Sequence, residues 1–131
     1  MDGERVGKME GVWAMSLHVD VISYRNVLVV RLAGELDHHT AEEVRTRVEK
    51  ELETGMYRNL ILNLQRLTFM DSSGLGVVLG RYKTMAEKKG TMRLCSVQPS
   101  VSRLFQLSGI HKILTVYDTE ESALTACGVA S

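Results

Sequence analysis

The sequence is poor in proline, cysteine and aromatic residues, and it has no excess of charge of either sign. Its 131 residues include one proline and two cysteines, 5% are aromatic, and 16 Lys and Arg balance 16 Asp and Glu. Nucleic-acid-binding domains usually carry a basic excess, so this balance argues against a nucleic-acid partner and against a polybasic membrane anchor. No run approaches the roughly 20 apolar residues that span a bilayer. We therefore expect no nucleic-acid and no membrane partner.

The two cysteines and the N-terminus point to a reducing compartment. Cys95 lies in an apolar run, Cys127 lies on a late helical pattern, and neither belongs to a Cys-x-x-Cys or a Cys/His ligand spacing. We interpret both as inert packing thiols. Acidic and basic residues alternate through Met1–Glu10, and no apolar signal-peptide segment follows. The sequence thus predicts a cytoplasmic protein that holds no metal.

The length of the chain suits one domain preceded by a short extension. Residues 1–14 are rich in glycine and charge and show no periodicity, so we predict a disordered N-terminal extension there. A regular pattern opens at Met15. The domain is therefore expected to span residues 15–131.

Apolar periodicity predicts an α/β fold. Leu17, Val19 and Val21 alternate with more polar residues, and a second apolar strand follows the turn at Asn26, which indicates an N-terminal hairpin. Strand and helix patterns then alternate, which implies crossover connections and parallel pairing. We expect a small mixed β-sheet with helices packed against it. The expected strands are 17–22, 27–32, 59–64, 91–97 and 113–117, and the expected helices run from about 40 to 55, 73 to 88, 100 to 107 and onward from 118.

The loop at Glu35–His39 leaves three interpretations open. It is an exposed acidic loop, a partner contact or, least favoured, a metal site, because adjacent histidine side chains point apart. Thr40 and Glu43 follow with the spacing of a capping box, in which the Thr40 hydroxyl accepts from an early helix amide and Glu43 reaches back. A basic cluster is expected to stay solvated at the negative end of the central helix; it consists of Arg81, Lys83, Lys88 and Lys89.

The strongest candidate site is Met70–Gly76, where a strand leads into a helix. Asp71 and Ser72 are both favourable N-cap residue types, and amides at a helix start have no intrahelical partner. A phosphate on an exposed serine here would meet free amides and the positive end of the helix dipole. The same Asp-Ser-Ser-Gly sequence is also common as an N-cap and turn without any function. Chemistry alone leaves both interpretations open.

The segment lacks the patterns of known catalytic sites. A nucleophile elbow needs Gly-x-Ser-x-Gly, but Met70 and Asp71 stand where the glycine would be required for Ser72 and Ser73. The Gly-Lys-Ser/Thr of a phosphate-binding loop is absent as well. A serine without a placed histidine base is not a hydrolase. We therefore expect no enzyme, no catalytic residue and no cofactor.

Two strings of the sequence, Gly34–Glu42 and Phe69–Val77, together resemble the anti-sigma factor antagonist family. The fold of that family is called STAS and is shared with the cytoplasmic tails of sulfate transporters. Gly-Glu-Leu-Asp-His-His-Thr from Gly34, the run Leu79–Lys83 and the ending Gly128–Ser131 look like the sporulation members, which antagonise the anti-sigma-F factor. The resemblance covers about Met15 to Ser131.

The resemblance implies that the antagonist acts by binding a partner protein, that this binding is switched on and off, and that the antagonist itself catalyses no reaction. In the family, the unphosphorylated antagonist binds an anti-sigma factor, a serine kinase with ATP or ADP in its site, and thereby releases the sigma factor. Phosphorylation by that kinase weakens binding, and a serine phosphatase restores it. The acceptor carries over to Ser72, with Ser73 less favoured, and Asp37 is implied at the kinase-facing surface. The implied partner-binding residues are Asp37, Asp71, Ser72, Ser73, Gly74, Leu75 and Gly76.

Two alternatives to the sporulation switch remain open. One is a nucleotide-binding STAS module, since related folds have been proposed to bind nucleotides, although the sequence has no phosphate-binding loop. The other is a stress-response antagonist of a different anti-sigma kinase. The Asp-His-His-Thr string at Asp37–Thr40 favours the sporulation kinase over the stress kinase.

Overall fold

The computed structural model describes residues 17–129, and it confirms the predicted α/β fold. Within that range the strands form one mixed sheet in the order β1-β2-β3-β4-β5. β1 and β2 form an antiparallel hairpin, and every later pairing is parallel. The elements in chain order are β1 (Leu17–Tyr24), β2 (Val27–Leu36), α1 (Ala41–Leu52), β3 (Asn59–Met70), α2 (Ser72–Glu87), β4 (Thr91–Cys95), α3 (Pro99–Ser108), the 3₁₀ helix η1 (Ile110–Lys112), β5 (Val116–Tyr117) and α4 (Glu120–Ala126).

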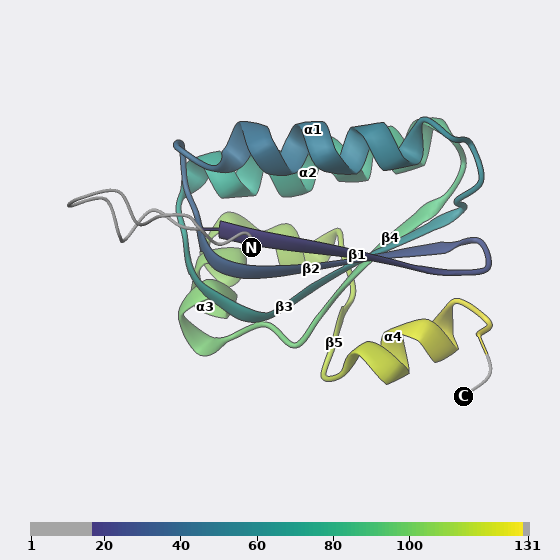
Figure 1. Ribbon diagram of the computed structural model, residues 1–131. Helices are drawn as coiled ribbons and strands as arrows, with labels where there is room; N and C mark the ends of the chain where they lie inside the picture. The colour runs from purple at the N-terminus through teal and green to yellow at the C-terminus, as the bar shows by residue number, and fades with distance from the viewer. Residues whose placement is uncertain (1–16, 130–131) are drawn as a thin grey trace.

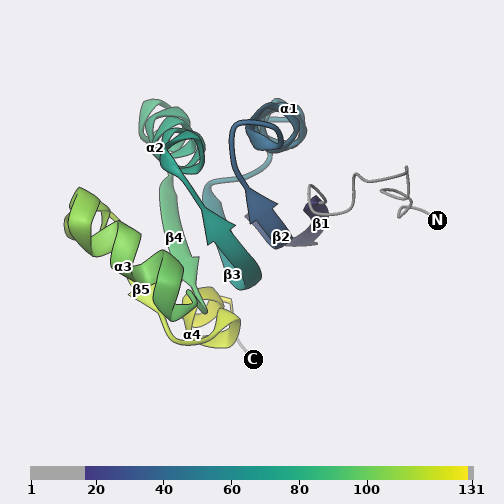
Figure 2. The ribbon, with the colours of Figure 1, turned by 90° about the vertical axis from the view of Figure 1, so that its left-hand side faces the viewer.

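Helices cover both faces of the sheet, but unequally. α1 and α2 lie side by side along one face, and the short α4 lies on the other (Figures 1 and 2). The main core lies beneath α1 and α2 and includes Val44 and Val48 of α1 and Val78 of α2. A smaller core beneath α4 joins Val29, Ile61 and other buried residues of the central strands. Strands buried on both faces read as continuous apolar runs, which explains the unbroken pattern at 27–30.

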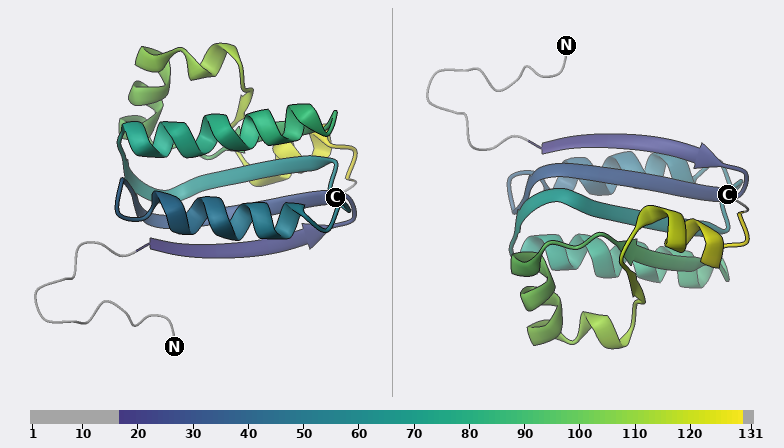
Figure 3. Two further views of the ribbon diagram at one scale, coloured as in Figure 1. Left: turned by 90° about the horizontal axis from the view of Figure 1, so that it is seen from above. Right: turned by 90° about the horizontal axis from the view of Figure 1, so that it is seen from below.

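α4 covers only part of its face of the sheet. Viewed from below, it crosses the strands at one end and leaves the rest of β2 and β3 open (Figure 3). The sequence explains this limit, because the apolar positions Val27 and Val29 on that face of β2 are followed by Arg31. No helix within residues 17–129 combines the length and apolar character needed to cross a bilayer. The extension predicted at residues 1–14 lies outside the described residues.

Several predicted boundaries of strands were wrong, and the largest differences lie at the ends of β2 and β3. The sequence placed a loop from Gly34 and ended the third strand at 64, whereas β2 runs to Leu36 and β3 to Met70. Irregularities in the register between Arg31 and Glu35 allow the polar residues there to stay paired. The last strand was predicted at 113–117 but comprises only Val116–Tyr117, because the chain first makes the η1 turn.

Two predicted side-chain roles were also wrong. Thr40 makes no side-chain cap of α1. Its hydroxyl instead donates to the Glu35 carbonyl oxygen at 2.9 Å and accepts from the Asp37 amide at 3.0 Å, so it closes the preceding loop. Arg81 was expected to be solvated but is only 7% exposed, because it lies between α2 and α1 with its Nε 2.6 Å from Oε2 of Glu49.

Candidate functional site

The two sequence motifs meet at one edge of the sheet. Leu36 at the end of β2 pairs with Met70 at the end of β3, and the Asp71 amide donates to the Leu36 carbonyl oxygen at 3.3 Å. Because the two strands are parallel, the loop that begins at Asp37 and the helix that begins at Ser72 leave the sheet on the same side (Figure 1). The carboxyl ends of parallel strands are where sites usually form in α/β folds.

Asp71 is the residue that caps α2. Its carboxylate Oδ1 accepts from the amides of Ser73 at 2.8 Å and Gly74 at 3.3 Å. Two of the amides at the helix start are thereby satisfied, which is the usual effect of an aspartate N-cap. Ser72 is left as the first residue of the helix with an exposed side chain, and its hydroxyl makes no hydrogen bond to any other residue of 17–129.

Gly74 allows α2 to approach the sheet closely. A Cβ atom built there would lie 3.0 Å from the Leu36 carbonyl oxygen and closer still to Cγ of Met70. Any other residue would therefore push the helix start away from the ends of β2 and β3. Ser73 beside it is half-buried, so of the two serines Ser72 is the more accessible.

The Asp37 loop is built around a buried carboxylate. Asp37 is 7% exposed, and its Oδ1 accepts from the amides of His39 at 2.8 Å and Thr40 at 3.2 Å. Burial alone would raise the pKa of Asp37, but these hydrogen bonds and the nearby His39 ring outweigh it and hold the pKa below its usual value. The carboxylate thus fixes the loop. The rings of His38 and His39 are exposed and tilted against each other with centroids 3.9 Å apart, so the prediction that these side chains point apart was wrong.

The face of α2 that begins at Ser72 is flat, because two of its residues are glycines without side chains. Ser72, Gly76 and Gly80 are four residues apart and lie on one helix face, and a Cβ at either glycine would meet nothing within 4 Å. Leu79 on the same side is 40% exposed, and Phe69 at the end of β3 is 46% exposed. The sequence prediction included Gly76 but missed Leu79 and Gly80, although the four-residue spacing was a usable signal.

The described residues offer no conventional reactive centre. Among residues 17–129, no three His, Cys, Asp or Glu side chains gather closely enough to hold a metal ion. Burial raises the pKa of the Cys95 thiol to about 11 and also raises that of Cys127, so neither thiol is a ready nucleophile. The feature that distinguishes this edge of the sheet is therefore the exposed Ser72 beside the loop that begins at Asp37.

Comparison with known proteins places this architecture in a family. The STAS domain family matches residues 18–123, so the chain belongs to the STAS domain family. The chain is 47% identical over 117 residues to an anti-sigma F factor antagonist of Paenibacillus polymyxa, covering 89% of this chain and all of that protein. It is 30% identical over 110 residues to the anti-sigma-B factor antagonist of Bacillus subtilis, covering 84% of this chain and 99% of that protein.

Solved structures agree with the sequence matches. The structure of the anti-sigma factor antagonist SpoIIAA in its unphosphorylated form matches with a TM-score of 0.75 at 35% identity, covering 88% of this chain and 100% of that one. The structure of the Bacillus cell fate determinant SpoIIAA in the phosphorylated form matches with a TM-score of 0.68 at 35% identity, covering 86% and 99%. Within the STAS proteins, the chain is thus a member of the anti-sigma factor antagonist family.

Proposed function

We propose that this protein antagonises an anti-sigma factor kinase of the sporulation type and that phosphorylation of Ser72 switches its binding off. The unphosphorylated form binds the kinase with ATP or ADP in its site and releases sigma-F, and a serine phosphatase restores that form. The protein acts in the cytoplasm by binding and performs no catalysis itself. The observation that carries the proposal is Ser72, an exposed hydroxyl without a hydrogen bond to any other described residue, at the first position of α2.

The position of Ser72 supports a switch that leaves the fold intact. Asp71 rather than Ser72 caps the helix, so a phosphate on Ser72 removes no existing hydrogen bond to another described residue. The phosphate would lie at the positive end of the helix dipole, which favours a negative group. It adds about −1.5 to −2 charges at neutral pH, next to the carboxylate of Asp71. The structures of SpoIIAA in its unphosphorylated and phosphorylated forms both share the fold of this chain, which agrees with such a switch.

The partner surface that we propose extends from the Asp37 loop across the start of α2. Asp37 acts through the loop that it holds, presenting His38 and His39, while Ser72, Gly76 and Leu79 offer a flat face with an apolar anchor. A glycine inside a helix costs roughly 0.5–1 kcal/mol relative to alanine. Since a Cβ atom at Gly76 or Gly80 would meet no described atom within 4 Å, packing within the domain does not require glycine there, and close approach of a partner is a reason to keep both. A doubly charged group at Ser72 would then lie inside the interface, where an uncompensated charge is costly.

The sporulation partner is favoured over the stress-response partner by similarity. Identity to the anti-sigma F factor antagonist of Paenibacillus polymyxa exceeds that to the anti-sigma-B factor antagonist of Bacillus subtilis by 47% to 30%. The alternative of a nucleotide-binding module has less support, because the sequence lacks a phosphate-binding loop.

Phosphorylation with a purified kinase tests the proposal directly. The chain and its Ser72→Ala and Ser73→Ala variants are each incubated with an anti-sigma F kinase and ATP, and their intact masses are measured. We expect one added phosphate on the parent and on Ser73→Ala, and none on Ser72→Ala. Phosphate retained on Ser72→Ala would move the acceptor elsewhere. If the parent stays unmodified while a known antagonist is phosphorylated by the same kinase, the proposal is wrong.

A further inference from the structure

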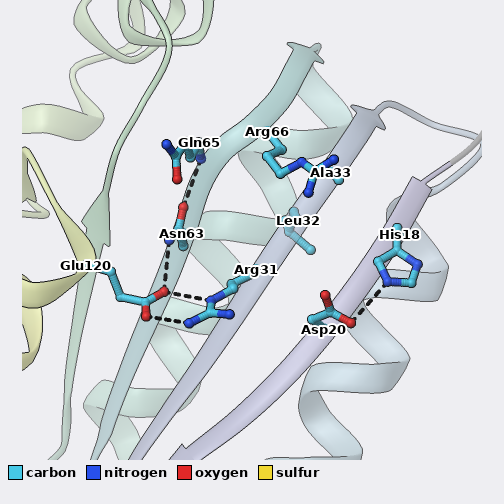
Figure 4. Close-up of a pocket in the computed structure, with 9 residues that line it drawn as sticks. All are labelled: His18, Asp20, Arg31, Leu32, Ala33, Asn63, Gln65, Arg66 and Glu120. Carbon is cyan, nitrogen blue, oxygen red and sulfur yellow. Dashed lines mark hydrogen bonds and ion pairs between the residues drawn. The ribbon is translucent and has the colours of Figure 1, made fainter.

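A pocket lies on the face of the sheet opposite α1 and α2, away from the Ser72 surface. It encloses about 480 Å³, within the roughly 300–1,000 Å³ typical of small-molecule sites. β1, β2 and β3 form its floor, and α4 contributes one wall (Figure 4). The pocket lies beyond the apolar patch beneath α4. The ribbon of α4 does not extend over this part of β2 and β3 (Figure 3).

Strand register explains why the sheet is hollow at this point. Ala33 of β2 pairs with His18 of β1 on one side and with Arg66 of β3 on the other. A methyl group between two long side chains leaves a depression. Arg31 lies two residues before Ala33 in β2, and it pairs with Asp20 of β1 and with Asn63 of β3. These three polar residues form a row that closes one end of the depression.

That polar row already holds a carboxylate of the chain itself. Glu120 accepts from Nε of Arg31 at 2.9 Å and from Nη2 at 2.7 Å, and the Asn63 amide donates to it at 2.8 Å. This forked arrangement is the one in which arginine binds carboxylates and phosphates most strongly. The pocket therefore contains the donor geometry that an oxyanion requires, with Glu120 occupying part of it.

The remaining charge of the pocket lies at Arg66. Each carboxylate in the lining has a cationic or potentially cationic partner, since Asp20 lies 3.0 Å from the His18 ring nitrogen and Glu120 is bound by Arg31. Among residues 17–129, the side chains of Arg66 and Gln65 make no hydrogen bond or ion pair, and both line the pocket. Within the same residues, Nη1 of Arg31 makes no hydrogen bond, because Glu120 uses only Nε and Nη2. Within the described residues, the guanidinium of Arg66 is therefore the cation of the pocket lining that has no acidic partner.

We propose that this pocket binds a small oxyanion, a carboxylate or phosphate group on a compact polar molecule, with Arg66 beside Ala33 as its charged donor. The site is independent of Ser72 phosphorylation, because the two lie on different parts of the molecule. A ligand here would contact β3 and the Arg31–Glu120 pair that holds α4.

Titrations followed by amide NMR shifts test the site with defined probes. Inorganic phosphate and acetate are added separately to the full chain, each against sodium chloride of equal ionic strength. The first variant, Arg66→Gln, removes the proposed charge, and the second, Ala33→Leu, fills the depression without changing any charge. Arg47→Gln is the matched control, since Arg47 is an exposed arginine on α1, across the sheet from the pocket.

We expect saturable shifts at Ala33, Asn63, Gln65 and Arg66 with at least one probe and not with chloride. Arg66→Gln should weaken that binding about tenfold, as expected for loss of one charge-assisted contact, and Arg47→Gln should leave it unchanged. Saturation with phosphate alone or with acetate alone would identify which oxyanion the site takes. Shifts that chloride reproduces, or equal affinity in the parent and in both pocket variants, would overturn the proposal.

Discussion

The backbone amide of Asp71 donates to the carbonyl oxygen of Leu36 at 3.3 Å, and this contact, next to the Leu36–Met70 pairing, joins the two segments proposed to bind the partner. Asp71 begins the turn into α2, and Leu36 is the last residue before the Asp37 loop. The relative position of Ser72 and His38 therefore depends on how closely the ends of β2 and β3 approach, and substitutions at this contact should affect both segments.

Gly74 and Gly76 should respond in opposite ways to alanine. Gly74→Ala places a methyl group against Leu36 and Met70, so we expect a loss of about 1–3 kcal/mol in the free energy of unfolding. Gly76→Ala enters open space and should raise that free energy by up to about 1 kcal/mol through helix propensity. Urea unfolding measures both. The interpretation fails if Gly74→Ala is as stable as the parent. Weakened kinase binding by the stable Gly76→Ala variant would support the proposed flat interface.

Asp37 should stabilise the domain in a pH-dependent manner. Its pKa is lowered in the folded state, so its contribution is fully present above the usual aspartate value of 3.8 and is lost as the pH falls through the lower folded value. Asp37→Asn should therefore be less stable than the parent at neutral pH, and the difference should shrink in that acidic range. Unfolding followed by circular dichroism at a series of pH values measures it. A difference that stays constant down to the acid limit would contradict this role.

Glu120 should hold α4 against the sheet. Hydrogen bonds from Arg31, opposed by burial, lower its pKa, so it stays ionised and paired near neutrality. Glu120→Gln should loosen α4 and speed the reaction of Cys95, which is buried beneath that helix, with a thiol reagent. Glu121→Gln is the control, because Glu121 is the exposed neighbour and its side chain bonds to no other residue of 17–129. Equal thiol reactivity in the two variants would show that apolar packing alone retains α4.

The Glu49–Arg81 pair should behave as a buried ion pair between α1 and α2. Nε and Nη1 of Arg81 are buried without a well-aligned hydrogen bond, so the charge of Glu49 is its main compensation. Burial also lowers the pKa of Arg81, against the opposing effect of Glu49. Glu49→Met should cost about 3–5 kcal/mol in the free energy of unfolding because a buried cation is left alone.

The double variant Glu49→Met, Arg81→Met separates this charge effect from a packing effect. It should recover most of the lost free energy of unfolding, since apolar replacements of buried pairs are often neutral. Denaturant unfolding of Glu49→Met, Arg81→Met and the double variant gives the coupling between the two positions. A double variant as unstable as Glu49→Met alone would mean that packing, and not the unpaired charge, causes the loss.

Much of the fold was predictable because it depends on local periodicity. The alternation at Leu17–Val21 gave the first strand, and the helical spacing that includes Val44 and Val48 gave α1. The boundaries failed where pairing with a neighbour overrides local preference. Glu35 was predicted in a loop and Phe69 beyond the end of the third strand, but the two residues pair across β2 and β3. The prediction that Thr40 caps the helix failed for a related reason. Its hydroxyl can bond either to the loop or to the helix, and it bonds to Glu35 and Asp37 of the loop.

By itself, the sequence determined the class of fold and the segment that begins at Asp71, because strand and helix periods and N-cap chemistry act over a few residues. The tertiary structure alone decided that Asp37 would be buried within its loop, that Arg81 would lie between two helices and that Ala33 would form the floor of a pocket. Each of these depends on residues far apart along the chain, such as Ala33 and Arg66, which pair across β2 and β3, or on a loop closed by hydrogen bonds from backbone amides to a carboxylate. Burial and charge pairing are set by which faces meet, and no local pattern encodes that.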